Sequence, residues 1–590
     1  MTETLSEDAN PPGVQVEPHS QVEADRALIN EARGKGKKSL FGAFVKLSGP
    51  GWLQSAITLG GGSLTGSLYL GVLAGTGLLW LQPLAMVLGI VMLSAIAYVT
   101  LSTGMRPFEA IRRHVNPVLA WAWAVATLMA NLVWAMPQFA LGTAALQQNL
   151  LPGVLGGTDP SQEQTIICVA VIFLLAGVVS WFYESGGKGI KVFELILKAM
   201  VGVVVVSFFA VVGLMLAKGQ VDFGEMLSGF VPKPSLLWRP ADTLTGFIDA
   251  TSNAEYWRAK IVTDQQKVML TAAATAVGIN MTFLLPYSML ARGWDRDFRG
   301  LATFDLSTGL LIPFILATTC VVVAAASQFH ANADSPAVVG LIDGNVSEKL
   351  GNKNLAGGYE KELDGLLKKQ NAGFGDLSDD ATAAARAALP REDNVVAALL
   401  VKRDAGNLSG ALKGLFGQFA DVVFGIGVFG MAISTVIILM LINGFVVCEM
   451  LGQPGNSTVH RAGAFLAACT GALGPFIWSG DAKLWLAVPT SMFGYALLPI
   501  AYVTFFLMMN SRSLLGEAMP TGGKRVLWNV LMGVAVALTL VGSFWSIYTG
   551  GYAKVGFGIM AAILVAALSV HFAKLGTLNE QAARREETSA

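Results

Sequence analysis

Residues Gly49–Leu68 read GPGWLQSAITLGGGSLTGSL, and this stretch decides the fold. It is apolar enough to enter a membrane, yet Gly60, Gly61, Gly62 and Ser63 interrupt its middle. Because successive glycines have weak helix propensity, the stretch is expected to break there into two half-helices. Broken backbone at membrane depth is tolerated only inside protein or beside a cavity, so the break predicts a functional centre.

A second apolar segment, Ile279–Tyr287 (INMTFLLPY), contains Pro286 and is expected to be interrupted as well. Two matched interruptions of this kind are typical of inverted-repeat transporters, whose substrate site lies between them. A run of small residues such as Gly60–Gly62 can also be a helix-packing face. The matched second interruption favours a substrate site.

The composition indicates a membrane protein. Of the 590 residues, 53% are hydrophobic and 14% are charged, whereas a soluble domain has about 25% charged residues. Many apolar runs reach the length of about 20 residues that a bilayer span needs. The formal net charge of +0 gives no reason to expect a nucleic-acid partner. The expected partners are the lipid bilayer and a small solute or metal ion.

Hydropathy predicts twelve spans. They are 49–70, 73–102, 117–147, 164–183, 192–217, 268–291, 305–328, 419–447, 462–479, 484–509, 526–548 and 553–573. Basic residues, including Arg112, Arg113, Arg296 and Arg299, fall on one side if the spans alternate. The positive-inside rule then places both termini in the cytosol, and we expect a bacterial inner membrane as the location.

The predicted spans divide the chain into eight segments. These are a disordered cytosolic tail (1–45), a first five-helix repeat (46–217), an extracellular amphipathic connection (218–267), helices 6 and 7 (268–330), an extracellular helical insert (331–416), helices 8 to 10 (417–511), helices 11 and 12 (512–573) and a cytosolic tail (574–590).

Several short motifs, in this order and spacing, resemble one transporter family. They are Gly49-Pro50, Ser102-Thr103-Gly104 with Glu109-Ala110, Phe304-Asp305 with Phe329-His330, Ser434-Thr435-Val436 with Glu449, and Pro499 followed by NSRSLLGE at 510–517. The stretches 46–150, 276–330 and 419–517 together are similar to the NRAMP divalent-metal transporters. The resemblance implies an all-α membrane protein with a five-plus-five inverted-repeat fold, LeuT-like, in which helices 1 and 6 unwind around a central site.

The sequence departs from that family at its site motifs. Gly60-Gly61-Gly62-Ser63 stands where the family has Asp-Pro-Gly-Asn, and Leu285-Pro286-Tyr287 stands where it has Met-Pro-His. The family's acidic pair in helix 3 falls near Met136 and Phe139, and its polar residue in helix 10 falls near Ser491, Tyr495 or Leu497. The scaffold thus resembles the family, whereas the site chemistry differs.

The predicted substrate site is neutral and rich in glycine and hydroxyl groups. Its residues are Gly60, Gly61, Gly62, Ser63, Asn280, Thr282, Leu285, Pro286, Tyr287 and Ser491. Conventional metal ligands are missing from this set, so its metal remains unknown; we expect no catalytic residue and no cofactor. A hard ion such as Mg²⁺ could use carbonyls, hydroxyls and retained waters.

Three functions follow as alternatives. The resemblance implies a secondary-active carrier of divalent metal cations that works by alternating access. The local chemistry also suits a carrier of a small neutral or anionic organic solute, because amides beyond Ser63 would favour an anionic group. The third alternative is a membrane sensor without transport, in which the insert at 331–416 binds a ligand. An enzyme is not expected, since the sequence shows no nucleophile–base set.

Overall fold

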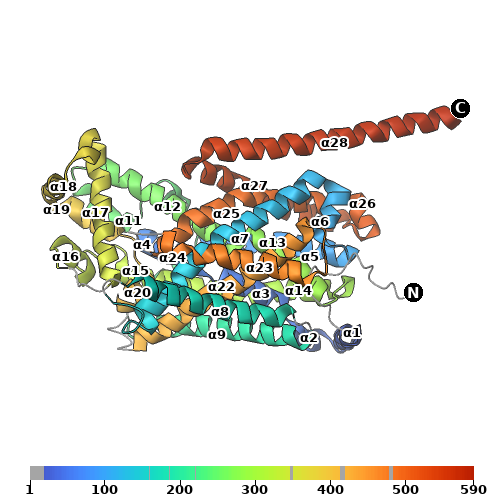
Figure 1. Ribbon diagram of the computed structural model, residues 1–590, viewed down its shortest axis with the longest axis horizontal. Coiled ribbons are helices and arrows are strands. Elements are labelled where there is room, and N and C mark those ends of the chain that lie inside the picture. The colour runs from blue at the N-terminus through green and yellow to red at the C-terminus, as the bar shows by residue number, and fades with distance from the viewer. Residues whose placement is uncertain are drawn as a thin grey trace.

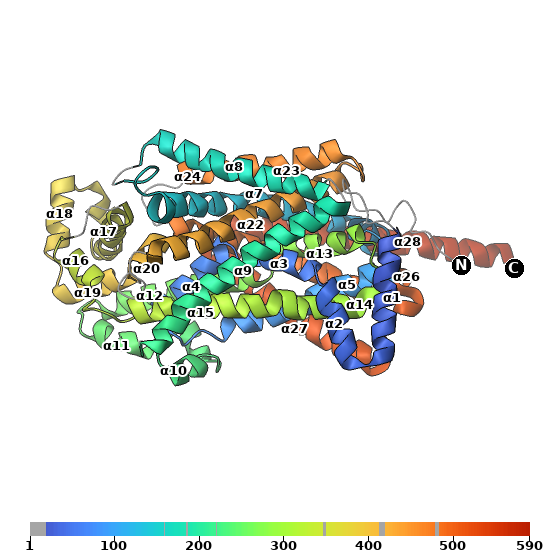
Figure 2. The same ribbon diagram turned by 90° about the horizontal axis from the view of Figure 1, so that it is seen from below.

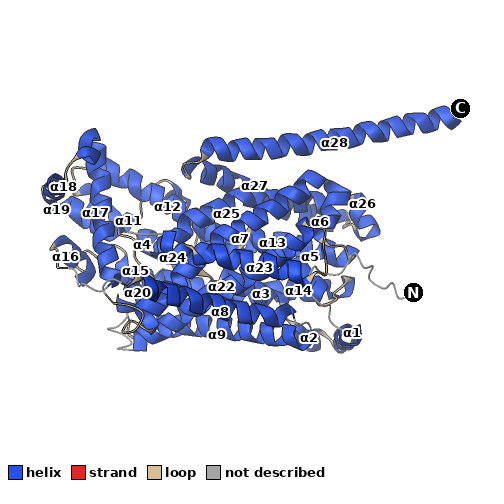
Figure 3. Cartoon of the chain, in the orientation of Figure 1, coloured by secondary structure: helices blue, strands red, loops and turns tan. Residues whose placement is uncertain are grey.

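The computed structural model describes residues 19–157, 160–184, 187–219, 221–345, 350–411, 419–477 and 483–589. Helices and loops make up all of these residues, and no strand occurs among them (Figure 3). Ten helices are long and apolar enough to cross a membrane, and one bent pair brings the total to eleven within the described residues. The predicted all-α membrane architecture is confirmed.

The first five predicted spans correspond to six long or half-length helices. They are α3 (Pro50–Thr58) with α4 (Gly61–Ala74), α5 (Leu81–Thr103), α7 (Pro117–Ala145), α8 (Gln162–Glu184) and α9 (Gly187–Ala217). Two of them begin with a proline whose missing N–H costs nothing at that position. At the start of α7, the Asn116 side chain accepts a hydrogen bond from the Val118 amide (2.9 Å). At the end of α5, Gly104 supplies the left-handed conformation (φ 65°) that closes the helix.

The later spans follow the same pattern. They are α12 (Ala254–Ala276) with α13 (Ile279–Ala291), α14 (Arg299–Asp305) continuing through a π-helical turn into α15 (Ile312–Phe329), α22 (Phe419–Met450), α23 (Ser457–Ala472), α25 (Ala487–Met509), α27 (Gly522–Thr549) and α28 (Ala553–Ser589). The span predicted at 462–479 becomes α23, a helix of 16 residues. In α28, the window from Ala553 to Ala573 buries none of its residues, so this helix lies at the periphery.

The predicted insert is a cluster of short helices at one end of the molecule (Figures 1 and 2). Its helices are α16 (Pro336–Ile342), α17 (Leu350–Gln370), α18 (Asp379–Ala387), α19 (Arg391–Leu400) and α20 (Ala405–Ala411). The cluster packs on α11 (Asp242–Asp249) and on the start of α12. There the Asp393 carboxylate accepts hydrogen bonds from Trp257 Nε1 (2.7 Å) and Asn253 Nδ2 (2.9 Å). Helix α12 therefore extends into the segment that was expected as a connection.

Residues 19–45 are not a disordered tail, which corrects the prediction for that part; residues 1–18 of the predicted tail lie outside the described residues. Residues 19–45 form α1 (His19–Lys35) and most of α2 (Lys37–Leu47), at the end opposite the insert (Figure 2). Ile29 on α1 is buried, and Arg26 forms an ion pair with Asp295 (2.6 Å). Because these contacts reach residues far along the chain, the polar composition of the tail alone could not reveal them. At the other terminus, α28 continues through Ser589.

Asp305 holds the start of α3. Its carboxylate accepts hydrogen bonds from the Gly51 amide (2.5 Å) and the Gly49 amide (3.2 Å), and also from the Ser48 hydroxyl. These amides belong to the first turn, which has no partners within the helix. The carboxylate therefore fixes the helix that leads to the first break.

Candidate functional site

The first break lies where the glycines predicted it. Helices α3 and α4 meet at Leu59–Gly60 with a bend of 54°. Gly60 is extended (φ −117°, ψ −172°), and its carbonyl accepts hydrogen bonds from Ser63 Oγ (2.9 Å) and the Leu64 amide (3.1 Å). All residues of α4 are buried, so the bend occurs deep inside the protein.

The glycines at this break are also required by packing. A Cβ atom at Gly60 would collide with Thr435 Oγ1 of α22. A Cβ atom at Gly61 would lie 3.0 Å from Gln138 Oε1 of α7, and one at Gly62 would lie 2.5 Å from Thr275 Cγ2 of α12. Three other helices therefore approach the broken backbone directly. The packing role and the site role that the sequence suggested are compatible.

The second break lies at Val277–Gly278, and its predicted position near Pro286 was wrong. Helix α12 ends at Ala276, α13 begins at Ile279, and Pro286 lies inside α13. Gly278 is needed here because a Cβ atom would collide with the indole of Trp134 on α7. A proline inside a membrane helix is tolerated where neighbouring groups satisfy the freed backbone.

The two breaks face one cavity of about 30 Å³. A site needs about 10–15 Å³ of such volume to hold a water molecule, so this cavity suits a small ion or a few atoms. Its lining comes from the broken helices (Ile57, Thr58, Gly60, Gly62, Ser63, Ala274, Thr275, Gly278, Asn280 and Met281) and from three neighbours (Trp134, Pro137 and Gln138 of α7, Thr435 of α22, and Ala487, Thr490 and Ser491 of α25).

Five of the ten residues predicted for the site line this cavity, namely Gly60, Gly62, Ser63, Asn280 and Ser491. The other five do not line it, namely Gly61, Thr282, Leu285, Pro286 and Tyr287. The Thr282 hydroxyl accepts a hydrogen bond from Trp123 Nε1 (3.0 Å), and the Tyr287 hydroxyl donates to Glu449 (2.9 Å). Because the break lies at Gly278, Thr282, Leu285 and Tyr287 lie one to three turns farther along α13 and do not reach the cavity.

Sequence reasoning missed several lining residues. Met281 lies three positions after Gly278, and its sulfur accepts a hydrogen bond from Thr58 Oγ1 (3.3 Å). The sequence had assigned the family's methionine position to Leu285, so this thioether went unnoticed. Gln138 of α7 also lines the cavity, and its Oε1 accepts a hydrogen bond from the Gly61 amide (2.8 Å), which joins α7 to α4.

The polar groups of the cavity are neutral. Asn280 Oδ1 accepts from the Met281 amide (2.9 Å), whereas the buried Asn280 Nδ2 has no hydrogen-bond partner within the described residues. The same part of the chain contains no group of three or more His, Cys, Asp or Glu residues that could hold a metal ion. The cavity can therefore offer hydroxyl, amide and carbonyl oxygens and one thioether to a ligand.

Charged groups close the end of the bundle that is opposite the insert. Glu449 at the end of α22 is buried, and it contacts Arg106 (3.2 Å) as well as Tyr287. Nearby, hydrogen bonds from Arg112 and Arg113 hold the pKa of Glu109 below its usual range, although burial opposes them. The Glu449 contacts join α22 to Tyr287 of α13 and to Arg106 in the segment between α5 and α7. None of these charged residues lines the central cavity.

Three comparisons identify relatives. The family model described as natural resistance-associated macrophage protein-like matches residues 51–343 and 382–573. Two curated relatives are each 29% identical, namely Metal transporter Nramp3.2 of Populus trichocarpa, over 195 residues (32% of this chain and 34% of that protein), and Metal transporter Nramp2 of Oryza sativa subsp. japonica, over 196 residues (32% and 33%). The matched stretch spans about a third of the length of these relatives.

Among solved structures, the chain is similar to the Eremococcus coleocola manganese transporter crystallised with an aromatic bis-isothiourea substituted compound. The TM-score is 0.56 at 14% identity, and the match covers 96% of this chain and 98% of that one. This likeness confirms the predicted inverted-repeat fold with broken helices 1 and 6. The family model covers most of the chain, so the protein belongs to the natural resistance-associated macrophage protein-like family.

Proposed function

We propose that this protein carries divalent metal cations across a membrane by alternating access. The observation that supports this most strongly is the cavity between the two broken helices, in a chain of this family. The C-terminal ends of α3 and α12 meet there, and the partial negative charge of a helix C-terminus favours a cation. The starts of α4 and α13 line the same cavity, but the Gly61 and Met281 amides there already donate to Gln138 Oε1 and Asn280 Oδ1. We propose a transporter, not an enzyme.

The cavity chemistry favours hard cations that keep part of their water. Thr58, Ser63, Asn280, Gln138 and Ser491 offer neutral oxygen atoms, and Mg²⁺ binds oxygen ligands and releases its waters reluctantly. Mn²⁺ also accepts such ligands, whereas softer metals favour imidazole and thiolate. Because the site adds no negative charge, its affinity for either ion should be modest. We therefore propose Mg²⁺ and Mn²⁺ as substrates that compete for one site.

The cavity lends less support to an organic solute. Its volume of about 30 Å³ is small for one. The Gly61 amide, which could have bound an anionic group, is already bonded to Gln138. The comparisons favour neither a carrier of this kind nor a sensor.

The arrangement of basic residues supports the proposed orientation. Arg26, Arg106, Arg112 and Arg296 belong to or flank elements at the end that carries α1, α6 (Pro107–Ala110) and α14, opposite the insert (Figure 1). Basic residues concentrate on the cytoplasmic side of membrane proteins. We therefore propose that both termini face the cytosol and that the insert faces outward. A bacterial inner membrane, expected from the sequence, stays part of the proposal.

A binding experiment on Gln138 tests the proposed site. We expect Gln138→Leu to weaken Mn²⁺ binding by about tenfold, since it removes a cavity oxygen and a polar contact to a charged group contributes about 1.5–3 kcal/mol. Equilibrium titration of the purified protein with Mn²⁺ would measure this, with Mg²⁺ as competitor. Gln82→Leu is a matched control, because Gln82 is equally buried but bonds to Ser67 (2.8 Å) away from the cavity. Equal affinities in all three proteins would contradict the proposal.

A further inference from the structure

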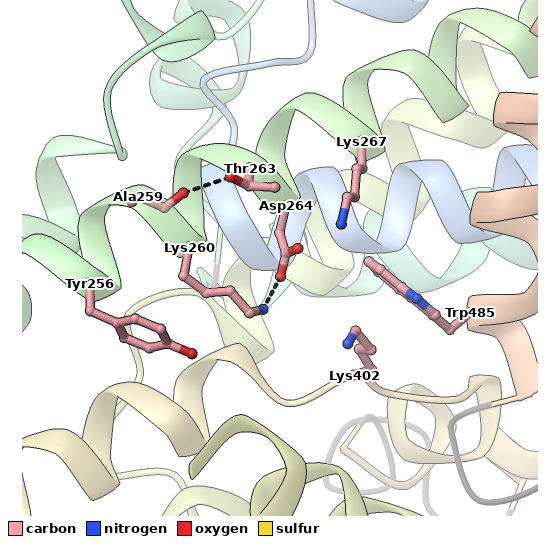
Figure 4. A pocket seen from close by; sticks show the side chains of 8 residues that line it. All are labelled: Tyr256, Ala259, Lys260, Thr263, Asp264, Lys267, Lys402 and Trp485. Carbon is pink, nitrogen blue, oxygen red and sulfur yellow. Dashed lines mark hydrogen bonds and ion pairs between the residues drawn. The ribbon is translucent and has the colours of Figure 1, made fainter. Parts of the chain in front are cut away.

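A second, larger cavity lies near the insert, closer to the N-terminal end of α12 than the central cavity is. It has a volume of about 340 Å³, and one face of α12 forms a wall with Tyr256, Lys260, Asp264 and Lys267 (Figure 4). Lys402 and Trp485 form the opposite wall. We call this cavity the outer pocket.

Among the described residues that line the outer pocket, lysines outnumber carboxylates. Lys260 forms ion pairs with Asp264 and with the buried Glu362 of α17 (2.9 Å). Lys402 Nζ forms a second ion pair with Glu362 (3.4 Å to Oε1) and lies over the Trp485 ring, 4.6 Å from its centre. Lys267 has no ion pair among the described residues, and its ammonium group points into the pocket (Figure 4). Among the described residues that line the outer pocket or pair with its lysines, three ammonium groups therefore stand beside two carboxylates, those of Asp264 and Glu362.

Lys402 stands on a rigid segment. Residues 401–404, here called the strap, connect α19 to α20. The strap carbonyl of Arg403 accepts a hydrogen bond from the Tyr69 hydroxyl of α4 (2.9 Å), and Asp404 Oδ1 accepts one from the Leu484 amide (3.1 Å). The buried Arg403 guanidinium donates to the Ala398 and Leu399 carbonyls at the end of α19 and to the Val401 carbonyl of the strap. These bonds hold the Lys402 backbone opposite α12.

The outer pocket is connected to the central cavity through α12 and α25. Lys267 and Thr275 both belong to α12, and eight residues of helix correspond to about 12 Å. Trp485, on a short 3₁₀ turn (Lys483–Leu486), directly precedes α25, which supplies Thr490 and Ser491 to that cavity. A ligand that joined the two walls of the outer pocket would therefore join α12 to the strap.

We propose that the outer pocket binds a small oxyanion, a carboxylate or a phosphate, between Lys267 and Lys402. An ammonium group donates three hydrogen bonds and accepts none, so a ligand that bridges two lysines on opposite walls needs several acceptor oxygens. The excess positive charge disfavours a divalent cation at this place. This binding does not depend on what the central cavity carries.

Binding would have a conformational consequence. An anion held by α12 and the strap together stabilises the arrangement in which they are close. By linkage, it opposes any motion that separates them, including the outward opening that alternating access requires. This consequence rests on the proposed transport function, whereas the binding itself does not.

Thermal unfolding of the purified full-length protein tests the site. Succinate and inorganic phosphate are titrated separately at constant ionic strength, against sodium chloride. We expect at least one of them to raise the melting temperature, and we expect Lys267→Gln and Lys402→Gln each to weaken its apparent affinity by about tenfold. Lys368→Gln, an exposed position on α17, is the control for a general charge effect and should bind as the wild type does.

The outcomes separate the possibilities. Stabilisation by succinate alone identifies a carboxylate ligand, and stabilisation by phosphate alone identifies a phosphate. If neither anion stabilises the wild type, or if Lys368→Gln weakens binding as much as Lys267→Gln does, the proposal is wrong. Hydrogen exchange at residues 401–404 provides a second measurement: it should slow with the anion in the wild type and not in Lys267→Gln. Failure of cation transport would leave these results unaffected.

Discussion

Gly62→Leu is expected to reduce Mn²⁺ uptake by about 10- to 100-fold, because overpacking of this kind costs about 1–3 kcal/mol. A Cβ atom at this position would already lie 2.5 Å from Thr275 Cγ2, so the Thr275 side chain, or α4 against α12, would have to shift. The rest of the leucine side chain would enter a cavity of only about 30 Å³. Initial uptake rates in proteoliposomes, normalised to the amount of reconstituted protein, would measure the effect.

Gly202→Leu is the matched control for this prediction. Gly202 lies on α9, and a Cβ atom there would meet nothing within 4 Å. This variant should transport at the wild-type rate. If Gly62→Leu also keeps the wild-type rate, the cavity between the broken helices is not on the transport path.

Asn280→Asp is expected to tighten Mn²⁺ binding by at least about tenfold, since close charge pairs in desolvated sites couple by about 1.5–7 kcal/mol. Asparagine and aspartate have the same shape, so the hydrogen bond from the Met281 amide can remain. The side-chain nitrogen that is lost had no partner among the described residues. The KM for Mn²⁺ uptake should fall, and the maximal rate should fall with it because the ion leaves more slowly.

Asn280→Leu removes the oxygen without adding charge, and it should weaken Mn²⁺ binding. Because Asn280→Asp should raise the Mn²⁺ affinity and Asn280→Leu should lower it, the pair distinguishes an electrostatic effect from a general disturbance of α13. An unchanged Mn²⁺ affinity in Asn280→Asp would mean that the ion binds elsewhere in the protein.

Local sequence was enough to predict the fold and one of its two breaks. Long apolar runs predicted the spans because a bilayer requires about 20 such residues. Gly60–Gly62 predicted the first break because the low helix propensity of glycine is intrinsic and does not depend on neighbouring helices. In contrast, Gly278 is a single glycine, and the reason for it, the indole of Trp134, comes from another helix. Pro286 was the stronger local signal and was misleading.

The composition of the site followed from that error. Because the second break was placed too late along the chain, Thr282, Leu285 and Tyr287 were assigned to the site, whereas Thr275 and Met281 were missed. Ser491 was found only through the family resemblance, since a single serine in an apolar span carries no distinctive pattern. The predicted neutral character of the site agrees with the cavity lining.

The most direct test of the central claim is the initial rate of Mn²⁺ and Mg²⁺ influx into proteoliposomes containing the wild-type protein, with Gly62→Leu vesicles as the background. A neutral, oxygen-lined cavity predicts that both ions enter and that excess Mg²⁺ suppresses Mn²⁺ entry. Influx of neither ion, from protein shown to be folded and inserted, would contradict the account.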